Sequence, residues 1–157
     1  MNKEDKVLLI KDLCARIPYA VKVELTNGFR GVLHNIEVIH LYNDDIETDY
    51  VDDYFASIDF FGDNDKFDIE GIKPYLFPLS SMTEEQKKEI SKRYKLHTYY
   101  GLYIEITNHS EGYWDDDNSC NLQDYLWLVD WFNKNHFDYR GLIEKGLAID
   151  ATGLNIY

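Results

Sequence analysis

The chain has 157 residues, of which 29 are acidic and 16 are basic, and its formal net charge at neutral pH is −13. Hydrophobic residues make up 45% of the sequence and aromatic residues 15%, which excludes a disordered chain of low hydrophobicity. The negative charge argues against a protein whose main role is to bind phosphate backbones or anionic lipids, because both ligands need a positive surface.

The N-terminal part predicts a helix followed by a hairpin. Apolar residues recur at intervals of three and four from Lys3 to about Arg16, and Pro18 ends this helix. The hydrophobic period then changes to two, which predicts a strand over 21–25. Asn27-Gly28 comes next, and this pair predicts a type I′ turn, in which both central residues need positive φ.

The following stretch predicts the other strands of a small antiparallel sheet. A return strand is expected over Phe29–Val38, with shorter strands at Ile46–Tyr50, Tyr54–Phe61 and Lys66–Ile69 and a turn over 62–65. We expect an α+β fold in which the N-terminal helix packs on these strands. The strands are expected to curl into a small β-barrel, for which an SH3-like barrel is the first choice.

Pro74 and Pro78 predict that the stretch 72–81 interrupts regular structure and joins two parts of the chain. Residues 1–79 would form the helix and the small barrel, and residues 80–157 a compact α/β part. The alternative is that the two parts form one compact unit.

A helix to about Tyr94 is expected after this joint, because Thr83 and Gln86 have the spacing of a capping box. A strand over 99–106 follows, in which apolar residues alternate with others.

The C-terminal third predicts two more helices. Asn121 caps a long helix to about Asn135, and a short helix over Asp138–Lys145 stops at Gly146. The expected core stripe of the long helix consists of Leu122, Tyr125, Leu126, Val129 and Phe132.

Two tryptophans on the long helix, Trp127 and Trp131, lie off this stripe and one turn apart. Burial between the sheet and another element explains them best. The alternative is a surface for self-association, in which case a homodimer through Trp127 and Trp131 is the expected form.

Cys14 and Cys120 lie far apart and have no metal-binding or redox spacing, so we expect two reduced and mostly buried thiols. The apolar run at residues 7–10 is too short for a secretory signal, and no stretch is long enough to span a membrane. The expected location is the cytoplasm.

Two segments carry a resemblance to known sequences. They are Ile72–Leu76 with the following Ser80–Glu85, and Trp131–Asp150, above all HFDYRGLIEKGLA at residues 136–148. Both resemble strings that recur in small uncharacterised proteins of gut bacteria and of their phages and prophages. The resemblance implies a soluble accessory protein of a mobile element. It carries over no activity, ligand or site residue.

The most informative feature is an acidic segment from Asp44 to Glu70, which contains eleven acidic residues and one basic residue, Lys66. Like charges at this density repel one another, so the segment is either a solvated face that keeps the protein soluble or a binding surface. Asp63 and Asp65 begin like an EF-hand loop, but the later ligand positions fail, and no metal site is expected. The candidate binding face combines acidic and aromatic residues: Asp44, Asp45, Asp49, Tyr50, Asp52, Asp53, Tyr54 and Trp114.

No catalytic or cofactor motif is present, so we expect a protein that is not an enzyme and needs no cofactor. The expected function is a protein-binding accessory module of phage or prophage origin, with neither nucleic acid nor membrane as a direct partner. Two alternatives remain at this point. One is an inhibitor that mimics nucleic acid and occupies a basic protein, and the other is a structural or oligomer-forming component.

Overall fold

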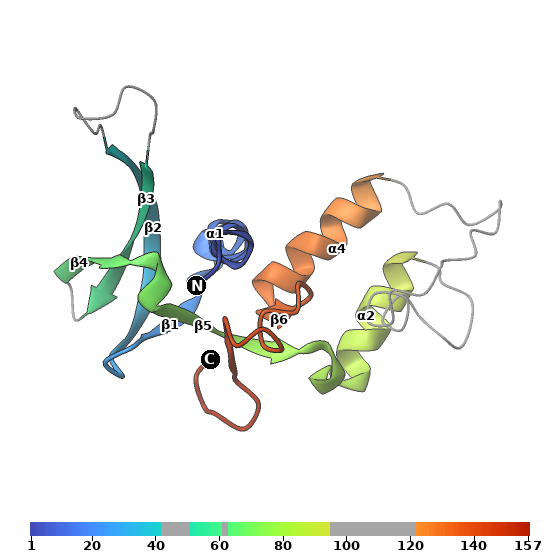
Figure 1. Ribbon diagram of the computed structural model, residues 1–157. Helices are drawn as coiled ribbons and strands as arrows, with labels where there is room; N and C mark the ends of the chain where they lie inside the picture. Colours follow the sequence, from blue (N-terminus) through green and yellow to red (C-terminus); the bar gives the residue numbers. More distant parts are fainter. Residues whose placement is uncertain (42–50, 61–62, 95–121) are drawn as a thin grey trace.

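The computed structural model describes residues 1–41, 51–60, 63–94 and 122–157, which form an α+β fold. Its strands form one sheet in the order β4-β3-β2-β1-β5-β6, and β7 also pairs with β5. Figure 1 shows α1 beside the sheet and the helices α2 and α4 at the end of the molecule away from β4. The predicted α+β class is confirmed. The sheet is open in the described part of the chain, so the predicted SH3-like barrel is not confirmed.

Helix α1 spans Lys3–Arg16, as the apolar spacing predicts. The side chain of Asn2 caps it by accepting a hydrogen bond from the backbone nitrogen of Asp5 at 2.7 Å. Leu9 and Leu13 lie four residues apart and are fully buried against the sheet. Cys14 is exposed, so the prediction of a buried thiol is wrong at this position; Cys120 lies outside the described residues.

Strands β1 (Lys22–Leu25) and β2 (Arg30–Leu41) form the predicted hairpin. The turn type differs from the prediction, because Gly28 has a positive φ of 83° and Asn27 does not. The backbone nitrogen of Gly28 donates to the carbonyl of Leu25 at 2.8 Å, and that of Leu25 donates to the carbonyl of Phe29 at 2.8 Å. This is a three-residue loop in which glycine takes the left-handed position.

Strand β3 (Val51–Phe60) pairs with β2 and begins three residues earlier than predicted. Strand β4 (Asp63–Asp68) pairs with β3, and residues 63–65 lie opposite Ile58–Phe60. The predicted turn over 62–65 is therefore wrong for 63–65, because backbone pairing with β3 extends through these polar residues. The predicted strand Ile46–Tyr50 lies outside the described residues.

Strand β5 (Ile72–Pro78) overturns the prediction that this stretch interrupts regular structure. It pairs with β1 on one side, and with β6 (Phe137–Asp138) and β7 (Ile149–Asp150) on the other. Pro74 is tolerated because of its register. The backbone carbonyl of Gly71 accepts a hydrogen bond from the backbone nitrogen of Thr26. In an antiparallel ladder, hydrogen-bonded pairs alternate with pairs that are not hydrogen-bonded, so Pro74 and Val23, three pairs further along, belong to the second kind. At this position β1 needs no N–H donor from β5, and proline is tolerated. Strands from both sides of residue 79 therefore share one sheet.

Helix α2 (Glu84–Tyr94) begins at the predicted capping box. The backbone nitrogen of Thr83 donates to Gln86 Oε1 at 2.8 Å, and that of Gln86 donates to Thr83 Oγ1 at 3.2 Å. The predicted strand over 99–106 lies outside the described residues.

Helix α4 spans Leu122–Lys134, close to the prediction, but its buried face differs. Tyr125 and Leu126 are exposed, whereas Leu128, Trp131 and Phe132 are buried. The helix is apolar over most of its circumference, so periodicity alone did not identify the face that meets the core. Trp127 is half-buried beside this face, and the homodimer interpretation stays a prediction.

The predicted helix over Asp138–Lys145 is wrong, because this segment forms β6 and a series of turns. The Asp138 carboxylate accepts hydrogen bonds from the backbone nitrogens of Leu142 at 2.9 Å and Ile143 at 2.8 Å. Gly141 and Gly146 have positive φ values of 73° and 69°. A side chain that binds nearby backbone groups competes with helical hydrogen bonds and favours turns.

Two buried clusters hold the chain together. The first joins α1 to the sheet, and the second joins α2 and α4 to the end of β5 and to β6. Arg16, which is fully buried, connects them: its Nε and Nη2 donate to the Asp12 carboxylate at 2.7 and 2.9 Å, and Nη2 donates to the carbonyl of Phe137 at 2.8 Å. A buried ion pair with these additional hydrogen bonds fixes where α1 meets β6.

Candidate functional site

Three residues of the predicted binding face lie in β3. Asp52, Asp53 and Tyr54 are opposite His40, Ile39 and Val38 of β2. The other residues of that face lie outside the described residues: Asp44, Asp45, Asp49, Tyr50 and Trp114.

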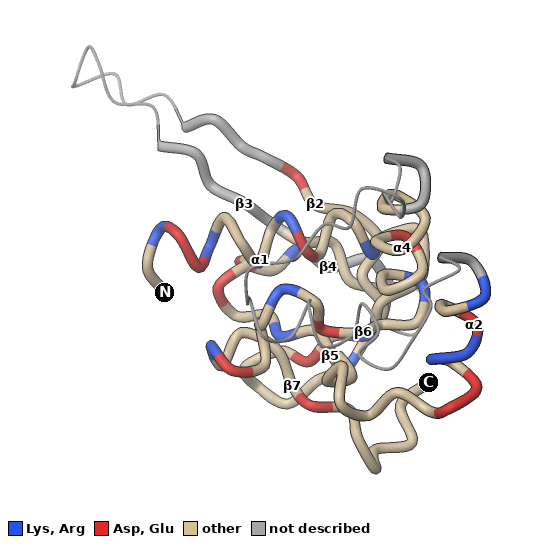
Figure 2. Tube along the Cα trace, turned by 90° about the vertical axis from the view of Figure 1, so that its right-hand side faces the viewer, with Lys and Arg blue, Asp and Glu red and all other residues tan. Residues whose placement is uncertain are grey.

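The described part of the acidic segment forms β3, β4 and the turn that follows them. Residues 51–60 and 63–70 contain seven acidic residues and one basic residue, Lys66, whose ammonium group pairs with Glu37 of β2. The ribbon of β2 and β3 extends away from β1 and β5 (Figure 1). Helices α1 and α2, by contrast, carry both signs of charge (Figure 2).

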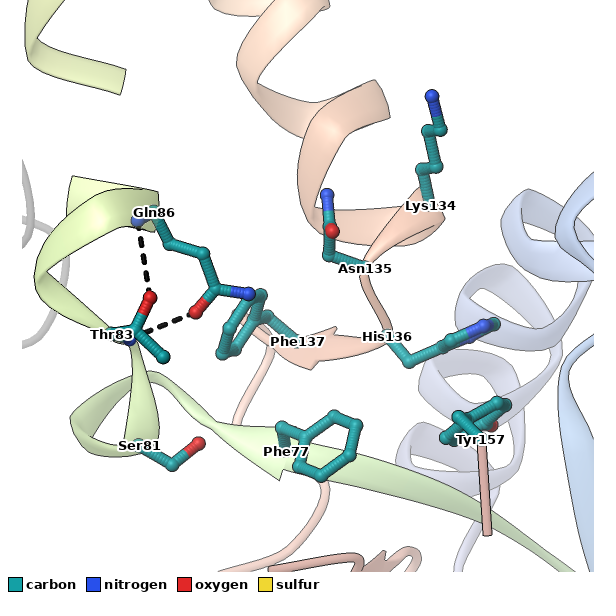
Figure 3. Close-up of a pocket in the computed structure, with 9 residues that line it drawn as sticks. All are labelled: Phe77, Ser81, Thr83, Gln86, Lys134, Asn135, His136, Phe137 and Tyr157. Carbon is teal, nitrogen blue, oxygen red and sulfur yellow. Dashed lines mark hydrogen bonds between the residues drawn. The ribbon is translucent and has the colours of Figure 1, made fainter. Parts of the chain in front are cut away.

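A separate cavity of about 470 Å³ lies where the end of β5, the start of α2, the end of α4 and the C-terminal residues meet. Its aromatic lining consists of Phe77, Phe137, His136 and Tyr157 (Figure 3). Its polar lining consists of Ser81, Thr83, Gln86, Lys134 and Asn135. None of these nine side chains is acidic.

His136 follows the end of α4 and has a positive φ of 57°. Its backbone nitrogen donates to Asn133 at 3.2 Å and its carbonyl accepts from Phe77 at 2.8 Å, so it ends the helix and begins the pairing with β5. Glycine or asparagine is the usual residue at such a left-handed position. The side chain is 8% exposed, and its Nδ1 has no hydrogen-bond partner among the described residues.

The ring of His136 is neutral at physiological pH. Burial lowers its pKa to about 4, and the positive charges of Arg16 and Lys22 act in the same direction. The ring lies against that of Tyr157, with centroids 3.9 Å apart and planes inclined by 10° (Figure 3).

Tyr157 connects the cavity to the sheet. Its hydroxyl accepts a hydrogen bond from the backbone nitrogen of Lys22 at 3.1 Å and donates one to the carbonyl of Tyr75 at 2.9 Å. By the register of β1 and β5, Lys22 and Tyr75 are opposite each other, so the hydroxyl stands where the two strands would otherwise bond directly. Burial raises the pKa of Tyr157 to about 12, so this hydroxyl stays protonated.

The polar side chains of the cavity differ in which hydrogen-bond donor or acceptor groups remain able to bind a ligand. Gln86 uses its carbonyl oxygen at the helix cap, so its NH₂ group remains as a donor. Asn135 donates its NH₂ group to Trp131 at 2.8 Å, so its carbonyl oxygen remains as an acceptor. Lys134 is exposed and has no ion-pair partner among the described residues.

Sequence reasoning missed this cavity. The capping box identified Thr83 and Gln86 as a helix start and gave no sign that they face a cavity. The segment that begins at His136 carries a resemblance and the prediction of a short helix over Asp138–Lys145, and neither indicates a cavity. A histidine directly after a predicted helix end, where glycine is usual, is the one local signal that could have drawn attention to it.

A smaller cavity, of about 310 Å³, is lined in part by Lys22, Arg30 and Tyr75. No group of three histidine, cysteine or carboxylate side chains comes together in the described part of the chain. None of the helices in the described ranges is long and apolar enough to cross a membrane. Comparisons with protein-family models, with curated proteins and with solved structures found no match.

Proposed function

We propose that this protein is a non-enzymatic accessory module of phage or prophage origin that binds a partner protein with a basic surface. The observation that carries the proposal is the acidic charge of β3 and β4, where residues 51–60 and 63–70 hold seven acidic residues and one basic residue. The basic residue, Lys66, already has Glu37 as its partner. Glu70 also has partners, because it pairs with Lys6 and with the N-terminal amino group. The charge of the other six acidic residues would attract a positive partner and exclude acidic ones.

The position of β4 supports the same proposal. In the described part of the sheet β4 pairs only with β3, so its other side is an edge. A charged edge strand resists pairing with another acidic or apolar strand. A segment rich in lysine and arginine would gain both main-chain hydrogen bonds and charge complementarity at this edge.

Capture of partners from a cell extract tests the proposal. The double variant Asp52→Lys and Asp53→Lys changes the charge of β3, and the matched control Glu89→Lys and Glu144→Lys makes the same charge change at exposed positions outside the acidic segment. We expect the wild type and the control to capture the same basic protein, identified by mass spectrometry, and the Asp52/Asp53 variant to lose it. Equal capture by all three proteins would refute the proposal.

Competition separates two kinds of basic partner. The purified captured protein is bound to the wild type, and duplex DNA is then added. Release of the partner by DNA would favour the nucleic-acid-mimicking inhibitor. Retention of the partner in excess DNA would favour recognition of a basic protein surface unrelated to nucleic acid.

A further inference from the structure

We propose that the cavity beside His136 binds a small aromatic carboxylate. Its volume of about 470 Å³ lies within the range of roughly 300–1,000 Å³ that is usual for small-molecule sites. The proposal concerns a different part of the molecule from the acidic segment and does not depend on it.

The aromatic lining favours a planar ligand. The rings of Phe77 and Phe137 have centroids 6.2 Å apart, and those of Phe77 and Tyr157 are 5.9 Å apart. His136 adds a neutral ring, which stacks on Tyr157. Flat aromatic ligands gain contact area on such walls at little cost in conformational entropy.

The charge of the lining favours an anion. The chain carries a net charge of −13, yet none of the nine lining side chains is acidic and one, that of Lys134, is basic. Lys134 has no ion-pair partner among the described residues, so its ammonium group can bind a carboxylate. It also offsets the partial negative charge at the end of α4. The NH₂ group of Gln86 supplies a second donor.

His136 occupies a backbone position that glycine would fill at lower cost, and its ring forms part of the cavity wall. A left-handed backbone costs a non-glycine residue about 1 kcal/mol or more, and glycine would serve the same turn without that cost. Its Nδ1 is buried and unpaired among the described residues, which is itself costly. The backbone conformation at this position therefore does not require a histidine, but the histidine ring lines the cavity.

Three probes of similar size and different charge test the proposal. Isothermal titration calorimetry compares indole-3-acetate (an anion), 3-methylindole (neutral) and tryptamine (a cation). We expect the anion to bind at least about tenfold more tightly than the other two, the effect of one charge-assisted hydrogen bond. Failure of indole-3-acetate to bind, or equal binding by tryptamine, would overturn the proposal.

Two conservative variants locate the binding. Gln86→Glu keeps the acceptor that Thr83 needs, so α2 keeps its capping box, but places a negative charge in the cavity. We expect it to retain its melting temperature and lose binding of the anion. Lys134→Gln should weaken binding about five- to tenfold, while the control Lys88→Gln, on the exposed side of α2, should not change it. If neither cavity variant alters binding, the anion binds elsewhere and the proposal is wrong.

Discussion

The ring of Tyr157 lies flat against that of His136, and through this contact the C-terminal residue meets the segment that follows α4. The same tyrosine bridges Lys22 and Tyr75 with its hydroxyl, so one side chain joins β1, β5 and the wall of the cavity. The backbone nitrogen of Lys22 and the carbonyl of Tyr75 depend on that hydroxyl for a hydrogen bond.

Tyr157→Phe removes this hydroxyl and keeps the ring. We expect the free energy of unfolding to fall by about 0.5–1.5 kcal/mol, because a backbone donor and a backbone acceptor exchange this hydroxyl for water. Urea denaturation followed by tryptophan fluorescence measures the change. Tyr125→Phe is the control, since Tyr125 is exposed, and it should leave stability within about 0.5 kcal/mol of the wild type. Equal effects of the two variants would contradict the bridging role.

His136 makes stability depend on pH. Its pKa in the folded protein is about 4, below the ordinary value of 6.5, so between these values the unfolded chain binds a proton that the folded chain does not. The contribution of His136 to stability is therefore largest above pH 6.5 and falls as the pH is lowered through this window, by at most about 3 kcal/mol at pH 4.

The variant His136→Asn tests this dependence, because asparagine tolerates positive φ and does not titrate. Urea denaturation at several pH values should show that the variant loses less stability than the wild type between pH 6.5 and 4. If the stability of the variant falls as steeply as that of the wild type between pH 6.5 and 4, groups other than His136 cause the pH dependence.

The sequence predicts well those elements whose local signals agree with one another. Helix α1, the β1–β2 hairpin and the capping box of α2 each combine a periodic apolar pattern or a fixed spacing with a clear start or stop residue. The local signals in β5 are misleading, because two prolines in the stretch argue against a strand. Its place in the sheet depends on register with β1 and on residues 137–150, which are distant in sequence.

The cavity could not be predicted for a similar reason. Its lining comes from three stretches of the chain, residues 77–86, 134–137 and 157. The one motif among them, the capping box of Thr83 and Gln86, indicates a helix start and not a binding site. The acidic segment was visible at once, because charge density is a property of the sequence alone. Whether β4 is an edge strand depends on the order of the strands, which the sequence does not state.

The buried pair of Asp12 and Arg16 should be strongly coupled. Arg16→Met leaves the Asp12 carboxylate buried with Arg140 as its remaining cation, at 3.4 Å. We expect this variant to lose roughly 3–5 kcal/mol of stability. The double variant Asp12→Leu and Arg16→Met should be less destabilised than the sum of the two single variants, because it leaves no fully buried charge unpaired. Arg140 also loses Asp12 as a partner, but its side chain is partly exposed to water. Additive effects in a double-mutant cycle measured by urea denaturation would refute this coupling.

Asp138 should determine the turn structure that replaces the expected last helix. Asp138→Ala removes the acceptor of two backbone N–H groups, those of Leu142 and Ile143, and we expect a loss of about 2 kcal/mol. Asp150→Ala is the matched control, because the exposed carboxylate of Asp150 accepts one such bond, from Thr152, and its loss should cost clearly less. Amide hydrogen exchange reads the effect locally: the Leu142 and Ile143 amides should exchange faster in the Asp138 variant only. Unchanged exchange at both amides would mean that Gly141 and Gly146, rather than the carboxylate, hold the chain in these turns.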